Sequence, residues 1–178
     1  MFVINLILNT VTGILVGVLL LRFWMQALRV RPPAQVAEFT FTLSDWLVKP
    51  LRRIVPGFGG YDWASLIGAF VVVLLSTAVT LLFGLRLEQL FFVALLAFLN
   101  WILWSLMLLL IVEVVFSWIN PHAPAAPFVR ALNEPLLRPL RRVIPPLGGL
   151  DMSVLVALIL LQIAQYYLPV VFGLLGLT

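Results

Sequence analysis

The sequence predicts an all-α membrane protein in which four transmembrane helices form two tandem helical hairpins, each with an amphipathic segment in its loop. Of its 178 residues, 63% are apolar and only 10% are charged, and the mean hydropathy is +1.17. Soluble domains typically have about 25% charged residues, so this composition excludes a soluble globular fold. Four long apolar runs and two loops of similar sequence lead to the hairpin arrangement.

Each apolar run is long enough for one membrane span, which takes about 20 residues. The runs cover residues 2–28, 63–85, 90–119 and 152–177. The third run would extend about 45 Å as a helix, so we expect it to tilt or to protrude from the hydrocarbon layer. Pro169 predicts a kink or an end to regular helix in the fourth run. The first run lacks a basic flank and exceeds a signal-peptide core, which favours a retained span.

The basic residues predict the orientation in the membrane. Nine of the 11 lysines and arginines lie in the loops between the first and second runs and between the third and fourth runs. The positive-inside rule therefore places both long loops in the cytoplasm and both termini on the opposite side. The formal charge of +4 then indicates anionic lipid as the partner of these loops, and not nucleic acid.

The two long loops are copies of one sequence. Residues 49–62 align without a gap with residues 138–151, and upstream a shift of two residues pairs Arg22 with Glu113 and Asn9 with Asn100. We therefore divide the chain into two repeats, residues 1–85 and 90–178, that insert the same way round. Such repeats are related by an axis along the membrane normal.

Each loop shows the periodicity of an amphipathic helix. Apolar residues such as Val36, Phe39 and Leu43 recur every three or four positions, and basic residues occupy the other face. The candidate lipid- or partner-binding residues are Lys49, Arg52, Arg53, Arg138, Arg141 and Arg142. Pro50, Pro135 and Pro139 predict two short helical pieces in each loop. A Gly pair follows each basic cluster, and Asp62 and Asp151, two positions after each pair, are expected to cap the following spans.

Two charges lie inside the predicted spans, at equivalent positions of the repeats. Arg22 and Glu113 each precede the cytoplasmic boundary by about 10 Å of helix. We expect an intramembrane pair that locks the repeats together; the alternatives are an arginine that reaches the surface and a role in transport. A polar layer in the outer half consists of Asn9, Asn100, Ser76 and Gln165. It predicts interhelical hydrogen bonds or, alternatively, a hydrated cavity. Gly13 and Gly17 form a GxxxG motif that predicts close helix packing within the chain or in a homodimer.

Catalytic and metal-binding chemistry has little support. The chain has no cysteine and one histidine, His122, which lies in a proline-rich loop. Thiolate catalysis, cysteine zinc sites and iron–sulfur clusters are thereby excluded. No phosphate-binding glycine loop and no nucleophile with a base is present. We expect no cofactor and a protein that is not an enzyme.

The loop motifs resemble the YggT (also called YlmG) family. The second copy carries the pattern most fully, with Ser117-Trp118-Ile119-Asn120-Pro121 followed by residues 134–153, EPLLRPLRRVIPPLGGLDMS. The first copy fits through residues 49–62 but has Gln26-Ala27 in place of the Ser-Trp pair. The resemblance covers the whole chain. It implies a small integral protein of the bacterial inner membrane, and it assigns no catalytic residues. In that membrane, the orientation given by the basic residues makes the protein multi-pass with both termini periplasmic.

These observations lead to two hypotheses. The resemblance implies an association with osmotic or potassium tolerance and with the cell envelope, but no agreed biochemical activity. The first hypothesis is an accessory or scaffold protein that acts in envelope or osmotic homeostasis through its basic loops. A protein partner or a homo-oligomer is expected. The alternative is an oligomeric potassium channel, or a regulator of transport, that uses Arg22 and Glu113.

Overall fold

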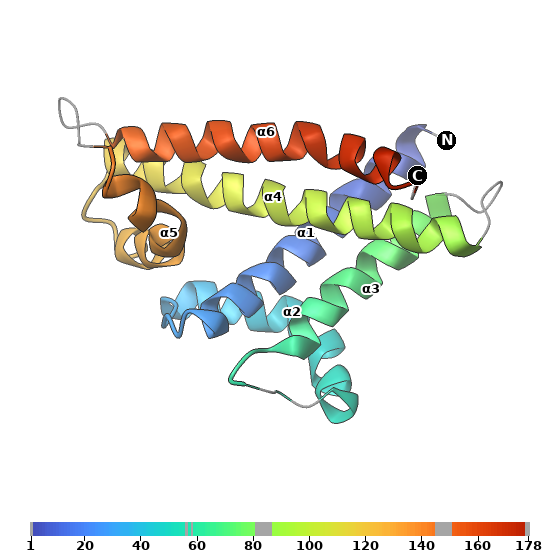
Figure 1. Ribbon diagram of the computed structural model, residues 1–178. Helices are drawn as coiled ribbons and strands as arrows, with labels where there is room; N and C mark the ends of the chain where they lie inside the picture. The colour runs from blue at the N-terminus through green and yellow to red at the C-terminus, as the bar shows by residue number, and fades with distance from the viewer. Residues whose placement is uncertain (1, 56, 58, 81–86, 145–150, 177–178) are drawn as a thin grey trace.

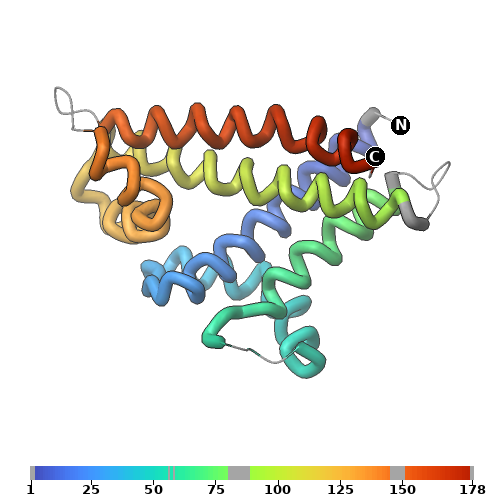
Figure 2. The backbone as a smooth tube through the Cα atoms, in the orientation of Figure 1, coloured from blue at the N-terminus to red at the C-terminus, as the bar shows by residue number. Residues whose placement is uncertain are grey.

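The computed structural model describes residues 2–55, 57, 59–80, 87–144 and 151–176, and its regular elements there are helices. In chain order they are α1 (Phe2–Ala27), α2 (Ala34–Ile54), α3 (Trp63–Thr80), α4 (Leu87–Ile119), α5 (Ala126–Arg141) and α6 (Met152–Leu174). Figure 2 shows the same order in the first half, α1 to α3, and in the second half, α4 to α6: a long helix, a shorter helix at its end, and a returning helix.

The apolar helices indicate a membrane protein. Three segments are long and apolar enough to cross a bilayer: Val3–Ala27, Gln89–Ile119 and Met152–Leu174. The second predicted span is a shorter apolar helix, Trp63–Val79, and residues 81–85 of that run lie outside the described residues. The long third run is one helix, α4, whose 33 residues extend about 50 Å.

The helices form two crossing pairs (Figure 1). Helix α3 runs back along α1, and α6 runs back along α4, while α4 contacts both α1 and α3. Helix α2 packs on α1 and α3, and α5 packs on α4 and α6. The start of α1 and the end of α6 therefore lie at one end of the molecule, and α5 lies at the other (Figure 1).

Three apolar clusters hold the helices together. One lies within the first half and includes Val16, Leu19 and Val48, and one lies within the second half and includes Leu110 and Leu137. The third cluster joins the halves, because Met25 of α1 packs against three residues of α5, namely Phe128, Val129 and Leu132. The indole of Trp24 also donates a hydrogen bond to the Leu132 carbonyl at 3.0 Å.

The GxxxG motif is used for packing within the chain. A Cβ added at Gly13 would lie 2.6 Å from the Trp101 ring of α4, whereas one added at Gly17 would meet nothing within 4 Å. Gly13 therefore allows α1 and α4 to approach each other. Gly17 borders a groove of about 540 Å³ between the same two helices.

The expectation that prolines divide the loop helices is wrong. Helix α2 continues through Pro50, and α5 continues through Pro135 and Pro139. These three prolines are exposed, so the carbonyls that lose their N–H partner are not sealed in the core, and the buried faces keep each helix in place. Helix α6 likewise continues past Pro169 to Leu174.

The turn after α2 agrees with the prediction. Gly59 and Gly60 have φ values of +68° and +82°, a conformation that glycine adopts without steric cost. The equivalent Gly148 and Gly149 lie outside the described residues.

Candidate functional site

The first candidate site is an ion-pair cluster around Arg22. This side chain is only 5% exposed. Its Nη1 donates to Ser44 Oγ at 2.6 Å and to Asp45 Oδ1 at 2.8 Å, and its Nε lies 3.4 Å from Asp62 Oδ2. The guanidinium also lies over the Phe41 ring, 4.9 Å from its centroid. One buried cation therefore ties α1 to α2 and to the start of α3.

Asp62 links the same three elements from the other side. Its side chain is 2% exposed and accepts hydrogen bonds from Arg52 and from the Ser65 hydroxyl, the latter at 2.7 Å. The Ser65 amide also donates to Asp62 Oδ1 at 3.4 Å. The predicted cap at the start of α3 is therefore confirmed, and the capping carboxylate is at the same time an ion-pair partner.

The environment keeps both carboxylates of this cluster ionised. Hydrogen bonds from Lys49 and Arg22 lower the pKa of Asp45. Burial raises the pKa of Asp62, but the hydrogen bonds from Arg52 and Ser65 outweigh burial and leave that pKa below its usual value. The hydrogen bond to Asp62 in turn raises the pKa of Arg52.

The second candidate site is an ion-pair cluster around Glu113, which is 8% exposed. Glu113 Oε1 accepts from Arg141 Nη2 at 2.9 Å, and Oε2 accepts from Asn133 Nδ2 at 2.8 Å. Arg141 also donates from Nη1 to Glu134 at 2.9 Å and from Nε to Asp151 Oδ2 at 2.8 Å. All three guanidinium nitrogens of Arg141 are thus in use.

The charge distribution around Arg141 has a clear effect on its pKa. Burial lowers the pKa of Arg141, but the hydrogen bond and charge of Asp151, followed by those of Glu113, raise it above its usual value. Asp151 also accepts a hydrogen bond from the Ser153 amide at 3.0 Å, which confirms the predicted cap at the start of α6.

The expected pairing of Arg22 with Glu113 is wrong. Arg22 makes its ion pairs with Asp45 and Asp62 in the first half, and Glu113 makes its ion pair with Arg141 in the second half. The physical reason is that α2 packs on α1 and α5 packs on α4. Each of these helices therefore brings an oppositely charged side chain to the buried charge of the long helix that precedes it. Among the described residues, every ion pair of these two charges lies within its own half.

The two clusters are built from equivalent positions. The 89-residue offset of the repeat relates Ser44 to Asn133, Asp45 to Glu134, Arg52 to Arg141 and Asp62 to Asp151. Sequence reasoning missed Ser44 and Asn133, which contact Arg22 and Glu113 respectively. The available signal was a polar residue, one place before the acid, at the same position of both copies.

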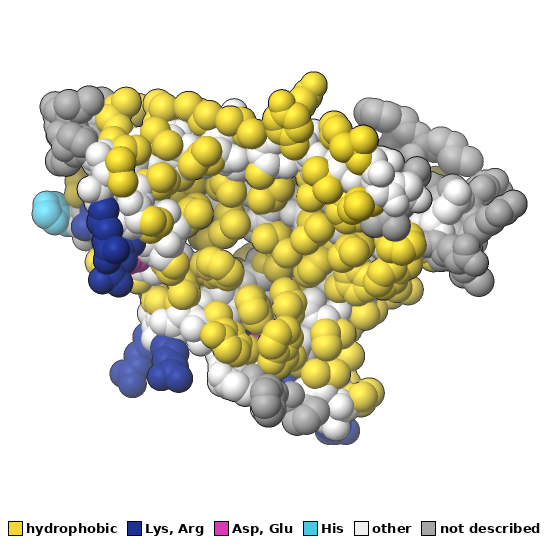
Figure 3. Space-filling model, in the orientation of Figure 1, with side chains coloured by type: hydrophobic (Ala, Val, Ile, Leu, Met, Phe, Trp, Pro, Cys, Tyr) yellow, Lys and Arg dark blue, Asp and Glu magenta, His cyan; other side chains and the backbone are white. Residues whose placement is uncertain are grey.

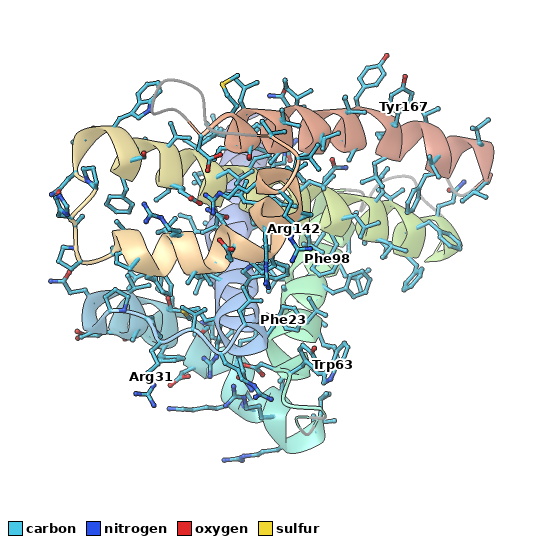
Figure 4. All side chains as sticks on the ribbon, turned by 60° about the vertical axis from the view of Figure 1, so that its left-hand side comes forward. Phe23, Arg31, Trp63, Phe98, Arg142 and Tyr167 are labelled. Atoms are coloured by element: carbon cyan, nitrogen blue, oxygen red, sulfur yellow. The ribbon has the colours of Figure 1, made fainter. Side chains whose placement is uncertain are left out.

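The predicted binding residues divide into two groups. Arg52 and Arg141 belong to the clusters. Lys49 is exposed and pairs with Asp45 at 2.8 Å, and Arg53, Arg138 and Arg142 are exposed without an ion pair among the described residues. Figure 3 shows basic side chains along the margins formed by α5 and the α1–α2 region, whereas the face over α4 and α6 is apolar. Arg31 also projects away from the helices (Figure 4).

Helix α2 has an exposed apolar face besides its basic one. Its buried residues are Thr40, Ser44 and Val48, whereas Phe39 and Trp46 are exposed. Aromatic residues also gather where α1 meets the start of α3: the ring centroids of Phe23 and Trp63 are 6.5 Å apart (Figure 4). The apolar residues of this predicted amphipathic helix are therefore divided between the core and the outer surface.

Two residues of the predicted polar layer, Ser76 and Asn100, make hydrogen bonds with residues outside that layer. Thr12 of α1 donates to Ser76 of α3 at 2.9 Å, and Asn100 donates to the Leu96 carbonyl of its own helix at 3.2 Å. Asn9 is exposed and lines the groove between α1 and α4, and Gln165 is half-buried. Among the described residues, no group of three acidic, histidine or cysteine side chains is placed to hold a metal ion.

The apolar helices, together with the two ion-pair clusters at their ends, are those of a helical membrane protein. The family model of CCB3/YggT matches two segments of the chain, residues 1–83 and 92–172. The chain therefore belongs to the CCB3/YggT family.

Similar proteins occur in several bacteria. The chain is 35% identical to an uncharacterized protein of Pseudomonas aeruginosa, with 88% of this chain and 83% of the relative covered. It is 30% identical to the uncharacterized protein YggT of Escherichia coli K12, with 90% and 86% covered. It is also 30% identical to an uncharacterized protein from the proC 3′ region of Vibrio alginolyticus, with 95% of both chains covered. No solved structure is similar to the chain.

Proposed function

We propose that the protein is a non-enzymatic scaffold of the bacterial inner membrane that acts in envelope or osmotic homeostasis. In this proposal α2 and α5 are platforms on the cytoplasmic headgroup layer, where they hold anionic lipid and a protein partner or a second copy of the chain. The main support for the proposal is that the ion pairs of Arg22 and Glu113 hold each platform against the helices of its own half. The outer faces of both platforms remain basic.

The charge distribution supports this orientation. With both long loops in the cytoplasm, the exposed Lys49, Arg53, Arg138 and Arg142 face the leaflet that is rich in anionic lipid. Each contributes about 1 kcal/mol near such a surface, so the four together favour anionic lipid over neutral lipid by several kcal/mol. Exposed Phe39 and Trp46 then enter the interfacial layer, where aromatic side chains are enriched.

The proposal is tested by neutralising the four exposed bases together. The variant combines Lys49→Gln, Arg53→Gln, Arg138→Gln and Arg142→Gln, none of which contacts Arg22 or Glu113. We expect the purified variant to retain several-fold less phosphatidylglycerol, measured by native mass spectrometry. We also expect it to fail to restore growth at high osmolarity in cells that lack the protein.

A matched control uses two exposed bases outside the platforms, Arg29→Gln with Arg31→Gln. These changes remove charge from the same loop but leave α2 and α5 untouched, so lipid retention and growth should stay near the wild-type level. Growth of the fourfold variant at the wild-type rate, with the protein correctly inserted, would overturn the proposed function.

The second candidate, an oligomeric potassium channel or transport regulator, depends on Arg22 and Glu113 acting as a pair. The geometry assigns these charges to separate clusters, so the candidate gains no support from the described residues. The channel candidate would replace the scaffold proposal if liposomes that contain only the purified protein showed potassium flux and Glu113→Gln abolished that flux.

A further inference from the structure

A cleft lies in the second half beside Glu113. It has a volume of about 490 Å³ and is bordered by the last turns of α4, by α5 and by the first turns of α6. Its polar lining consists of Glu113, Ser117, Arg130, Arg141 and Asp151. Its apolar lining includes Trp118, Leu155 and Leu158. The cleft therefore combines a charged end with an apolar wall.

The ion-pair cluster around Arg141 carries more negative than positive charge. Glu113, Glu134 and Asp151 all make ion pairs with the single guanidinium of Arg141. Residues 145–150, which precede Asp151, contain no charged side chain. Each guanidinium nitrogen of Arg141 already donates a hydrogen bond to one of these carboxylates. The carboxylate oxygens can therefore accept further hydrogen bonds from a donor other than Arg141.

The equivalent cluster in the first half has the opposite balance. There Asp45 and Asp62 are shared among Arg22, Lys49 and Arg52, so three cations meet two carboxylates. Two differences account for the shortage of cations in the second cluster: Glu113 replaces Arg22, and Arg138, at the position equivalent to Lys49, makes no ion pair among the described residues. A buried carboxylate without full compensation is costly, which favours a ligand that supplies the missing cation.

Arg130 offers a complementary contact at the same cleft. It is exposed, it lines the cleft, and it makes no ion pair among the described residues. Because a guanidinium can bind two oxygens of a phosphate at once, Arg130 is suited to a phosphate lying next to the carboxylates.

The apolar wall leads out of the cleft along the membrane-facing surface. Trp118 and Leu155 are exposed, and the latter lies on α6, one of the helices long and apolar enough to cross the bilayer. An acyl chain can therefore follow this wall while its headgroup occupies the charged end.

We propose that this cleft binds a phospholipid whose headgroup carries a primary ammonium beside its phosphate, as in phosphatidylethanolamine. The ammonium donates hydrogen bonds to Glu113 and Asp151, and the phosphate accepts from Arg130. A primary ammonium has three donors, whereas the quaternary ammonium of phosphatidylcholine has none. The site uses residues of α5 but not the exposed bases Arg138 and Arg142 of the proposed scaffold, so it does not depend on the function of those bases.

The test compares lipids that share acyl chains and differ in headgroup. The full-length protein is exchanged into micelles with equal amounts of phosphatidylethanolamine, phosphatidylcholine and phosphatidylglycerol, and bound lipids are identified by native mass spectrometry. We expect about tenfold preference for phosphatidylethanolamine over phosphatidylcholine, which is the effect of one charge-assisted hydrogen bond. Glu113→Gln should abolish the preference, and the matched control Asp45→Asn in the first half should preserve it.

Two further variants keep the test informative if Glu113→Gln does not fold. Glu134→Gln changes a half-exposed side chain and removes one of the surplus charges, so it should reduce the preference. Arg130→Gln removes the phosphate contact and should weaken retention of phosphatidylethanolamine and phosphatidylglycerol alike, without restoring phosphatidylcholine. The thermal unfolding midpoint of each variant confirms that it is folded.

Three outcomes would overturn the proposal. One is equal retention of phosphatidylethanolamine and phosphatidylcholine by the wild type. Another is a preference for phosphatidylglycerol that survives Arg130→Gln. The third is complete displacement of phosphatidylethanolamine by potassium chloride or by free ethanolamine, which would identify a soluble cation as the occupant.

Discussion

The two ion-pair clusters have the same construction around opposite charges. In each half, a charge near the end of the long helix contacts a polar residue and an oppositely charged residue of the next helix. An arginine of that next helix also forms an ion pair with the aspartate that precedes the returning helix. The centre is Arg22 in the first half and Glu113 in the second. The comparison shows that the same arrangement of helices holds a buried side chain of either positive or negative charge at this position.

The two clusters have central charges of opposite sign, and their capping aspartates also differ in solvent exposure. Asp62 is 2% exposed in the first cluster, whereas Asp151 is 37% exposed in the second. The first cluster has sufficient cations and is closed, and the second has excess carboxylates and borders a cleft. One cluster is therefore suited to holding helices together, and the other is suited to receiving a ligand as well.

The largest expected effect comes from exchanging the central charges. Arg22→Glu places a third carboxylate beside Asp45 and Asp62 and should cost about 3–5 kcal/mol of unfolding free energy. Glu113→Arg should cost less, about 2–3 kcal/mol, because it places a second guanidinium beside Arg141 but attraction to Glu134 and Asp151 offsets part of the lost contacts. Unfolding in nanodiscs, followed by circular dichroism, measures both. Rescue of Arg22→Glu by adding Glu113→Arg would contradict the separate clusters.

The two capping aspartates should differ in the same direction. Asparagine is as good an N-cap as aspartate, so Asp→Asn mainly removes the ion pair. We expect Asp62→Asn to cost about 3 kcal/mol because its side chain is buried, and Asp151→Asn to cost about 1 kcal/mol or less because water screens it. Thermal unfolding of the two variants side by side is the measurement. Equal losses of unfolding free energy in the two variants would show that burial of the capping aspartate does not distinguish the clusters.

Acid should open the first cluster partially. The folded-state pKa values of Asp45 and Asp62 are lowered, so their stabilising contribution is complete above the unfolded value of about 4. It is lost as the pH falls through the folded values. We expect faster hydrogen exchange in α2 below about pH 4. Asp62→Asn should show a smaller change over this range, and an unchanged acid response in that variant would argue against Asp62 as the source.

The smallest effect should come from the exposed bases. Lys49 forms an exposed i,i+4 pair with Asp45, so Lys49→Gln should cost about 0.3–0.5 kcal/mol. Arg138→Gln, at the equivalent position, should change stability by less than about 0.5 kcal/mol. Chemical unfolding in micelles distinguishes these values from those above. A loss of several kcal/mol from either variant would mean that the platforms carry structural as well as surface charges.

Local patterns of the sequence were sufficient for the helices and their ends. Apolar runs predicted the four hydrophobic helices, and the Asp after each Gly pair predicted the caps at Asp62 and Asp151. The prolines of α2 and α5 were interpreted wrongly, because a proline rule describes an isolated helix. Packing of Val48 and Leu137 in the core keeps these helices continuous despite the lost hydrogen bonds.

The sequence by itself determined that this protein is apolar, helical and internally repeated, and that two charges occupy equivalent buried positions. Only the tertiary structure decided the partners of those charges. The repeat places Arg22 and Glu113 at the same depth but does not say how far apart their helices lie, whereas folding of α2 and α5 brings Asp45 and Arg141 to within 3 Å of them. Ion pairs depend on such distances, and a sequence pattern does not contain them.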